Sequence, residues 1–183
     1  MASFPDDNEL LLLFRDPVTK ERGYTQLVKK YQEKIYWHIR RLVVDHDDAN
    51  DVMQNVFIKV WKGLDQFRED ARFYTWLYRI ATNESLSFLE KEKKKASVSF
   101  EDISLALSEK LAADKDFDLS KIEWKLQVAI QKLPEKQKLV FSLRYYEEMS
   151  YQEMSKVLDT TEGALKASYH HAVKKIEEFI LNS

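Results

Sequence analysis

The fold class is decided by the stretch Asp47-Asp-Ala-Asn-Asp-Val-Met-Gln-Asn-Val-Phe-Ile-Lys-Val-Trp61. Its apolar side chains recur at intervals of three and four residues, which is the period of one face of an α-helix. The opposite face is polar, so the stretch predicts an amphipathic helix over residues 48–62 with one buried side. The apolar positions are Ala49, Val52, Met53, Val56, Phe57, Val60 and Trp61, followed by Leu64.

Helical patterns continue on both sides of this stretch. Before it, apolar residues from Leu27 to Leu42 follow the same spacing. After it, Gly63 ends the helix, and residues 64–72 are expected to form a loop. A third helix is predicted over residues 73–94, and its basic C-terminal run suits the negative end of a helix dipole. Further helices are predicted over 122–133 (stopped by Pro134), 135–146, 150–158 and 162–181, with a capping box at Ser150 and Glu153.

Composition supports a helical protein and excludes several other classes. The 183 residues include only three Gly and three Pro, which argues against turn-rich sheets and glycine-lined phosphate loops. Cysteine is absent, so disulfides and thiolate metal sites are excluded, in keeping with a reducing cytoplasm. No apolar run approaches the ~20 residues of a membrane span, and the acidic start is unlike a signal peptide. We therefore expect a cytoplasmic protein.

The chain divides into three blocks. Residues 1–95 and 122–183 carry the helical patterns, whereas residues 96–121 are acidic and lack a sustained helical stripe. This middle block is interpreted as a flexible linker with a short helical turn around residues 105–111. The expected architecture is all-α, with two small helical domains joined by an acidic linker.

Residues 150–181 have the pattern of a helix-turn-helix, in which the second helix enters the DNA major groove. Gly163 would let the start of this helix approach a phosphate, whose charge a helix N-terminus favours. A plain helical hairpin with a solvated face is the alternative at this point. The residues on the outward face are Gly163, Lys166, Ala167, His170, His171 and Lys174.

Aromatic and basic residues are interleaved from Phe67 to Asn83, across the expected loop and the next helix. Single-stranded DNA is held by stacking on aromatic rings while cations follow its phosphates. Asn83 can hydrogen-bond a base edge, and Phe67 is expected to be an exposed loop aromatic with no core to join. The alternative is that these side chains are core residues, which we expect for Trp76, Leu77 and Ile80.

Catalysis and metal binding find little support. His170 and His171 are adjacent and point about 100° apart on a helix, so they do not face one metal. Asp45, Asp47 and Asp48 are better explained as capping the helix that follows them. We find no catalytic triad, phosphate loop or deaminase motif. The protein is expected to be no enzyme and to need no metal or cofactor.

Taken together, three motifs resemble the extracytoplasmic-function class of bacterial sigma factors. The first is the 47–61 stretch. The second is Phe67-Arg68 followed by Phe73-Tyr-Thr-Trp-Leu-Tyr-Arg-Ile-Ala-Thr-Asn83. The third combines Leu133-Pro-Glu-Lys-Gln-Lys-Leu-Val-Phe141 with Tyr151-Gln-Glu-Met154 and Gly163-Ala-Leu-Lys166. Their order, with a linker before the third, is more specific than any motif alone.

The resemblance implies roles for individual residues. The first motif would dock on the clamp helices of the largest subunit of core RNA polymerase, through Asp48, Asp51, Gln54 and Asn55. The second would melt promoter DNA at the minus-ten element through Phe67, Arg68, Tyr74, Arg79 and Asn83, with Phe67 and Asn83 capturing a flipped base. The third would contact the polymerase flap and read the minus-thirty-five element through Arg144 and the outward helix face described above.

This chain departs from the family pattern in its recognition helix. Ser168, His171 and Val173 stand where the family often has arginine. The formal net charge of −2 also suits a protein that binds DNA as part of a larger complex. An anti-sigma factor is the expected regulator. The alternative function is a stand-alone helix-turn-helix regulator, and a helical scaffold or an enzyme ranks third.

Overall fold

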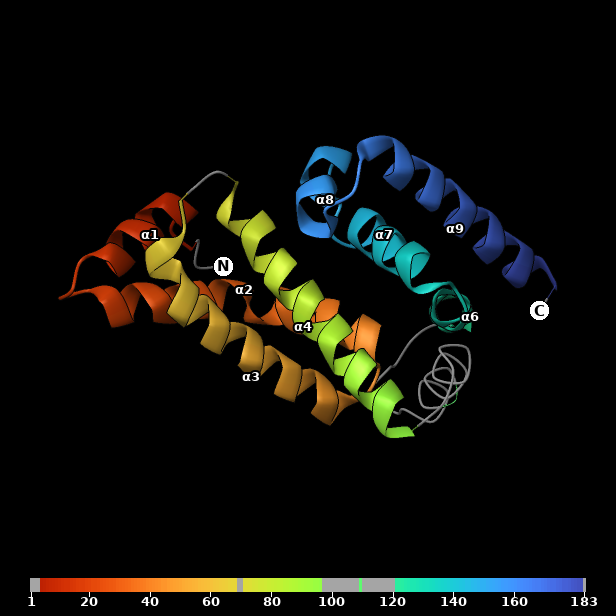
Figure 1. Ribbon diagram of the computed structural model, residues 1–183, viewed down its shortest axis with the longest axis horizontal. Helices are drawn as coiled ribbons and strands as arrows, with labels where there is room; N and C mark the ends of the chain where they lie inside the picture. Colours follow the sequence, from red (N-terminus) through yellow and green to blue (C-terminus); the bar gives the residue numbers. More distant parts are fainter. Residues whose placement is uncertain (1–3, 69–70, 97–108, 110–120, 183) are drawn as a thin grey trace.

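The computed structural model describes the chain except residues 1–3, 69–70, 97–108, 110–120 and 183. Its described elements are α-helices and one short 3₁₀ turn, with no strand among them, which confirms the all-α class (Figure 1). The helices are α1 (Asp7–Arg15), α2 (Lys20–Val43), α3 (His46–Gly63), η1 (Leu64–Gln66), α4 (Phe73–Ala96), α6 (Lys121–Gln131), α7 (Glu135–Tyr145), α8 (Tyr151–Leu158) and α9 (Glu162–Asn182).

Helix α3 begins two residues before its predicted start, because Asp45 caps it. The Asp45 carboxylate accepts hydrogen bonds from the backbone N–H groups of Asp47 (3.0 Å) and Asp48 (3.2 Å). These are among the N–H groups that a helix start leaves without an intrahelical partner. Capping therefore accounts for the aspartate-rich start of this helix.

Helix α1 was not predicted from the sequence. Its start is fixed by a capping box in which the Glu9 N–H donates to the Asp6 carboxylate at 2.8 Å and Glu9 reaches back to the Asp6 N–H. Leu10, Leu11 and Phe14 are buried against α2. The two helices cross closely at Gly23, where a Cβ atom would lie 2.6 Å from the Phe14 backbone nitrogen. Only glycine fits this crossing without displacing α1.

The first domain is formed by α1 to α4, and the apolar stripe of α3 faces its core. Val52, Val56 and Val60 are buried, as the spacing predicts. Trp61 differs, because 37% of it is exposed and its indole lies edge-on to Phe14 (5.5 Å) and Tyr24 (4.9 Å). The indole thus covers the α1–α2 contact from outside.

The C-terminal helices α6 to α9 form the second domain. The predicted capping box at the start of α8 is present, with the Glu153 N–H donating to the Ser150 hydroxyl at 3.2 Å. Helix α8 ends at Leu158, and the φ of 49° at the C-cap residue Asp159 places that residue in the left-handed region. The chain then turns directly into α9, so α8 and α9 form the expected helix-turn-helix.

The two domains pack against each other, with α4 lying along α8 and α2 approaching α7 (Figure 1). Met149, Met154 and Val157 of the second domain belong to the same buried cluster as Leu77 and Tyr78 of the first. This shared core was not predicted. The linker and its helical turn fall almost wholly outside the described residues, so the domain boundaries stay predictions.

Candidate nucleic-acid interface

Helix α9 presents one polar face to solvent and one apolar face to its own domain. Leu165, Ala172 and Ile176 are buried. A Cβ atom on Gly163 would meet nothing within 4 Å, so the start of the helix is open to a ligand. All six residues predicted on the outward face are exposed, namely Gly163, Lys166, Ala167, His170, His171 and Lys174.

The turn before α9 holds its first helical residues in place. The Thr161 hydroxyl accepts a hydrogen bond from the Ala164 N–H at 3.3 Å, which caps the helix start. Lys166 extends over the Tyr151 ring at 5.6 Å, so its ammonium lies between α8 and α9. A backbone phosphate placed at the helix start would meet both the helix dipole and this cation.

Arg144, for which the resemblance implies a DNA contact, has an internal role in this structure. Its guanidinium donates to the Met149 carbonyl oxygen at 2.9 Å and lies 5.4 Å from the Tyr151 ring. The side chain is half-buried and braces the turn between α7 and α8. An arginine has five N–H donors, so others remain for a second contact.

The residues predicted to dock on polymerase lie on the outer side of α3. Asp51, Gln54 and Asn55 are exposed, whereas Asp48 is half-buried in the first turn. Their exposure follows directly from the burial of Val52 and Val56 on the opposite side. The face therefore offers one carboxylate and two carboxamides to a partner without disturbing the core.

The expectation of an exposed Phe67 is wrong. The Phe67 N–H donates to the Leu64 carbonyl oxygen at 3.2 Å, which closes the 3₁₀ turn and directs the chain back toward α4. The ring is half-buried, 5.1 Å from Trp76 and 6.0 Å from Phe73. Phe67 thus packs at the edge of the core, and part of its ring remains accessible.

The other predicted minus-ten residues differ in accessibility. Arg68, Arg79 and Asn83 are exposed. Tyr74 is half-buried, and its hydroxyl donates to the Glu147 carbonyl oxygen at 3.1 Å. Burial, and next the Glu147 carboxylate, raise the pKa of Tyr74, so its hydroxyl stays protonated.

Phe67 and Asn83 are not brought together. Phe67 lines an open cavity of about 750 Å³, whereas Asn83 lines a second one of about 310 Å³. Asn83 also follows Phe73, the first residue of α4, by ten positions, which is about 15 Å along the helix. The two side chains sit at different places along α4 and not in one pocket.

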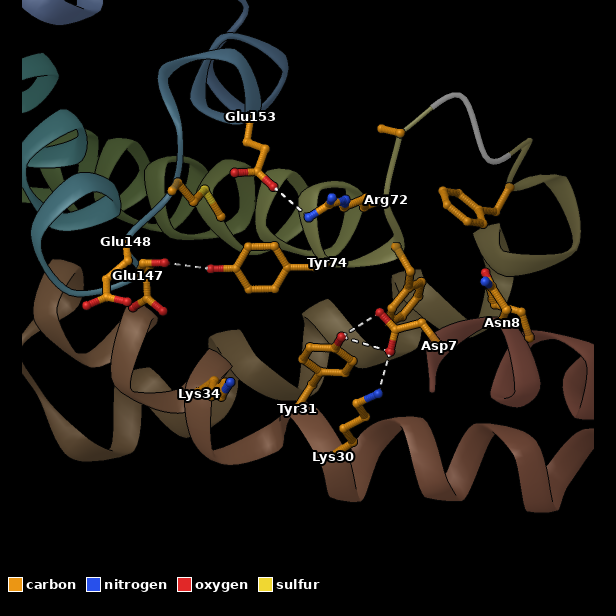
Figure 2. Close-up of a pocket in the computed structure, with 15 residues that line it drawn as sticks. Asp7, Asn8, Lys30, Tyr31, Lys34, Arg72, Tyr74, Glu147, Glu148 and Glu153 are labelled. Carbon is orange, nitrogen blue, oxygen red and sulfur yellow. Dashed lines mark hydrogen bonds and ion pairs between the residues drawn. The ribbon is translucent and has the colours of Figure 1, made fainter. Parts of the chain in front are cut away.

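The larger cavity lies between the domains (Figure 2). Lys30 and Tyr31 form one wall and both contact the Asp7 carboxylate, at 2.8 and 2.7 Å. Glu147 and Glu153 reach it from the second domain, and Arg72 lies 3.6 Å from Glu153. Sequence patterns did not single out Glu147 and indicated Glu153 only as part of the capping box of α8, because their place at this cavity depends on which surfaces meet.

This fold and these surfaces define a two-domain helical DNA-binding protein, with a helix-turn-helix at one end and an aromatic, basic segment at the other. Comparison with known proteins places it further. The family model for sigma-70 region 2 matches residues 27–95, and the model for sigma-70 region 4 matches residues 123–176.

Similar proteins are named as sigma factors. RNA polymerase sigma-H factor of Pseudomonas aeruginosa is 33% identical over 166 residues, covering 86% of each chain. ECF RNA polymerase sigma-E factor of Escherichia coli K12 is 32% identical over 165 residues, again covering 86% of each chain. The chain therefore belongs to the sigma-70 family, in its extracytoplasmic-function class, and it is an RNA polymerase sigma factor for promoter recognition.

Solved structures agree on the fold. CnrH, solved in complex with the cytosolic domain of CnrY, has a TM-score of 0.70 at 20% identity and covers 97% of this chain and 99% of its own. RpoE of Bartonella quintana, solved with the anti-sigma factor NepR, has a TM-score of 0.69 at 17% identity, covering 87% and 97%. Within the described residues, no helix is both long and apolar enough to cross a membrane.

Proposed function

We propose that this sigma factor binds core RNA polymerase through the exposed face of α3. Asp51, Gln54 and Asn55 point outward there, with Asp48 at the edge of the same face. The clamp helices of the largest subunit are the proposed partner of this face, and the polymerase flap that of the second domain. The opposite side of α3 packs into the core, so the polar face is the side that can contact a partner.

The start of α4 and the residues before it are the proposed minus-ten reader. Arg68 and Arg79 offer exposed cations for phosphates, while the Phe67 ring and Tyr74 offer aromatic surface. Asn83 would recognise a base edge, since a carboxamide both donates and accepts. In this structure Tyr74 is hydrogen-bonded to the second domain. Binding of the minus-ten element by these residues therefore requires the two domains to rearrange.

The outward face of α9 is the proposed minus-thirty-five reader. Short residues at Gly163 and Ala167 let the helix lie close to the groove, while Lys166 and Lys174 supply charge. Arg144 would add a phosphate contact from α7. The regulator would be an anti-sigma protein acting in the cytoplasm, and the protein itself would catalyse no reaction.

The observation that carries this proposal is the placement of the three motifs on three separate faces of one small chain. A stand-alone regulator would need its own basic footprint, and the net charge of −2 does not supply one. Each face can therefore be disabled alone, and the loss measured in transcription.

The test is run-off transcription by purified core polymerase on a library of promoter sequences. Asp51→Arg combined with Gln54→Ala should abolish binding to core polymerase and all specific transcripts, with an unchanged melting temperature. The matched control is Glu21→Arg with Gln32→Ala, which makes the same change of charge and the same Gln→Ala change at exposed positions of α2. Full core binding by the α3 variant would refute docking through this face.

A further inference from the structure

Three hydrogen-bond donors of the first domain converge on one residue of the second. The residue is Glu147, in the turn between α7 and α8. Its Oε1 accepts from Arg41 at 3.1 Å, and its Oε2 accepts from the Tyr78 hydroxyl at 2.5 Å. Its backbone carbonyl oxygen accepts from Tyr74 at 3.1 Å, as Figure 2 shows. Glu147 is thus the polar centre of the contact between the domains.

The second domain holds this turn in shape independently of the first. The Met149 N–H donates to the Leu143 carbonyl oxygen at 3.1 Å, and Arg144 bonds the Met149 carbonyl oxygen from the other side. Glu148 adopts a φ of 53°, a left-handed conformation that reverses the chain. The turn is therefore already formed, and Glu147 projects from it toward the first domain.

The contact is partly shielded from solvent, which makes it sensitive to the loss of any one member. Side-chain exposure is 9% for Glu147 and 20% for Arg41. A buried ion pair adds little net stability, but removing one partner leaves an uncompensated charge and is strongly unfavourable. Burial, and next Glu147, raise the pKa of Tyr78, so its hydroxyl remains a donor. The arrangement is favourable only when the domains are fully closed.

Closure engages part of one functional face and leaves the others free. Tyr74 is bonded to Glu147, and Asp159 and Thr160 of the helix-turn-helix line the same open cavity as Arg79 and Asn83. By contrast, the outward face of α9 and the polar face of α3 are both exposed. The closed chain thus shows its docking face, while Tyr74 of the proposed minus-ten reader is tied to the second domain and Arg79 and Asn83 face that domain across an open cavity.

We propose that Glu147 is an autoinhibitory latch, which holds the free sigma factor closed until the two domains separate. The closure itself stands on the contacts described above, whereas the inhibition rests on the proposed function of the α4 residues. A second tie supports the same closure, because the Gln131 side chain donates to the Arg41 carbonyl oxygen at 2.8 Å.

The chain lacks cysteine, so two dyes can be attached at chosen positions of the full-length protein. Lys62→Cys on α3 and Glu177→Cys on α9 are exposed and lie outside the contact. Single-molecule energy transfer then reports the ratio of open to closed molecules. Glu147→Gln and Tyr78→Phe should each raise this ratio about tenfold, the effect expected for a charged hydrogen bond. Glu148→Gln, with the same charge change one residue later, is the matched control.

If Glu147→Gln and Tyr78→Phe both retain the ratio of the Glu148→Gln control, the latch is refuted. Circular-dichroism melting identifies any variant that is simply unfolded, and Tyr78→Phe keeps the ring in place should Glu147→Gln fail. Run-off transcription with core polymerase then tests the inhibition, since an opened variant should shorten the lag before open-complex formation. Opening with an unchanged lag would refute autoinhibition. If the variants open but the protein supports no transcription with core polymerase, the closure is upheld and the proposed function is refuted.

Discussion

His38 lies wholly inside the first domain, on α2. One of its ring nitrogens is 3.0 Å from the Thr82 hydroxyl, and its ring lies 5.0 Å from that of Tyr78. Burial, assisted by the positive charge of Arg41, lowers the pKa of His38 to about 3. The imidazole is therefore neutral throughout the physiological range, and protonating it requires the core to open.

A pH dependence of stability follows from this burial. The unfolded chain takes up a proton at His38 near pH 6.5, whereas the folded chain does not until about pH 3. The contribution of neutral His38 to the free energy of unfolding is complete above pH 6.5. It is lost as the pH falls toward 3, by up to ~1.4 kcal/mol for each pH unit. Between pH 7 and pH 5, the free energy of unfolding measured with urea should fall by about 2 kcal/mol less for His38→Gln than for the parent protein. Parallel losses in both proteins would contradict this prediction.

Exposure at single positions was predictable where a helix fixes it. Burial of Leu165 and Ala172 turns Lys166 and His170 outward, and the three-and-four spacing contains that information. Phe67 lies outside any helix, so no period specifies where its ring points. Its direction is set by the 3₁₀ turn and by the neighbouring Trp76, which only the tertiary structure supplies.

The half-buried Phe67 predicts a double effect for Phe67→Ala. Loss of its contacts with Phe73 and Trp76 should cost roughly 0.5–3 kcal/mol of stability, and loss of a stacked base ~1–3 kcal/mol of open-complex stability. At a temperature where the variant is folded, a premelted template should restore much of its activity. Asn83→Ala, at an exposed position, should melt normally but relax the preference at one base. Permanganate footprinting on duplex and premelted templates measures both effects.

At the scale of elements, the amphipathic helices were predicted to within a few residues where each carries a complete apolar stripe, except that α2 begins seven residues before the predicted Leu27. Helix α1 was missed because its apolar run from Leu10 to Phe14 is too short to show a period. A local signal was nevertheless present, since Asp6 and Glu9 have the spacing of a capping box. Attention to the cap would have revealed the helix.

The sidedness of α9 gives a prediction with an internal control. Lys166→Ala and His170→Ala should each weaken selection of the upstream promoter element, because both are exposed on the proposed reading face. Lys175 is also exposed but lies half a turn around the helix from Lys166, at the edge of the face one turn beyond His171. Lys175→Ala should leave the selected sequence unchanged. The upstream sequence that each variant selects from a promoter library is compared by sequencing. Identical selected sequences for all three variants would rule out base reading by α9.

At the scale of the whole molecule, the sequence indicated two domains but not how they meet. The contact depends on a turn residue, Glu147, and on Tyr78, whose place in a helical stripe marks it only as a core residue. Neither has a local pattern that distinguishes it from other glutamates or tyrosines. Which surfaces pair is decided by their three-dimensional complementarity, so the shared core became visible only in the structure.

The balance of charge predicts how the free protein meets DNA. With a net charge of −2 and few cations on α9, the chain alone should bind duplex promoter DNA weakly. Its affinity should also fall only gently with salt, because the slope is about −0.9 per phosphate neutralised. Fluorescence anisotropy at several salt concentrations measures the slope. Nanomolar binding at physiological salt without polymerase would contradict this expectation.

The crossing of α1 over α2 has a practical consequence for anyone who divides the chain. The region 2 match begins at residue 27, seven residues into α2. A fragment cut at that boundary would lose Gly23, the Phe14 ring under Trp61, and the Tyr24 hydroxyl that donates to the Phe57 carbonyl oxygen at 2.7 Å. It would expose apolar surface of α2 and α3 and tend to aggregate. The smallest piece of this domain that can be expressed alone should therefore begin at the cap of α1, at Asp6.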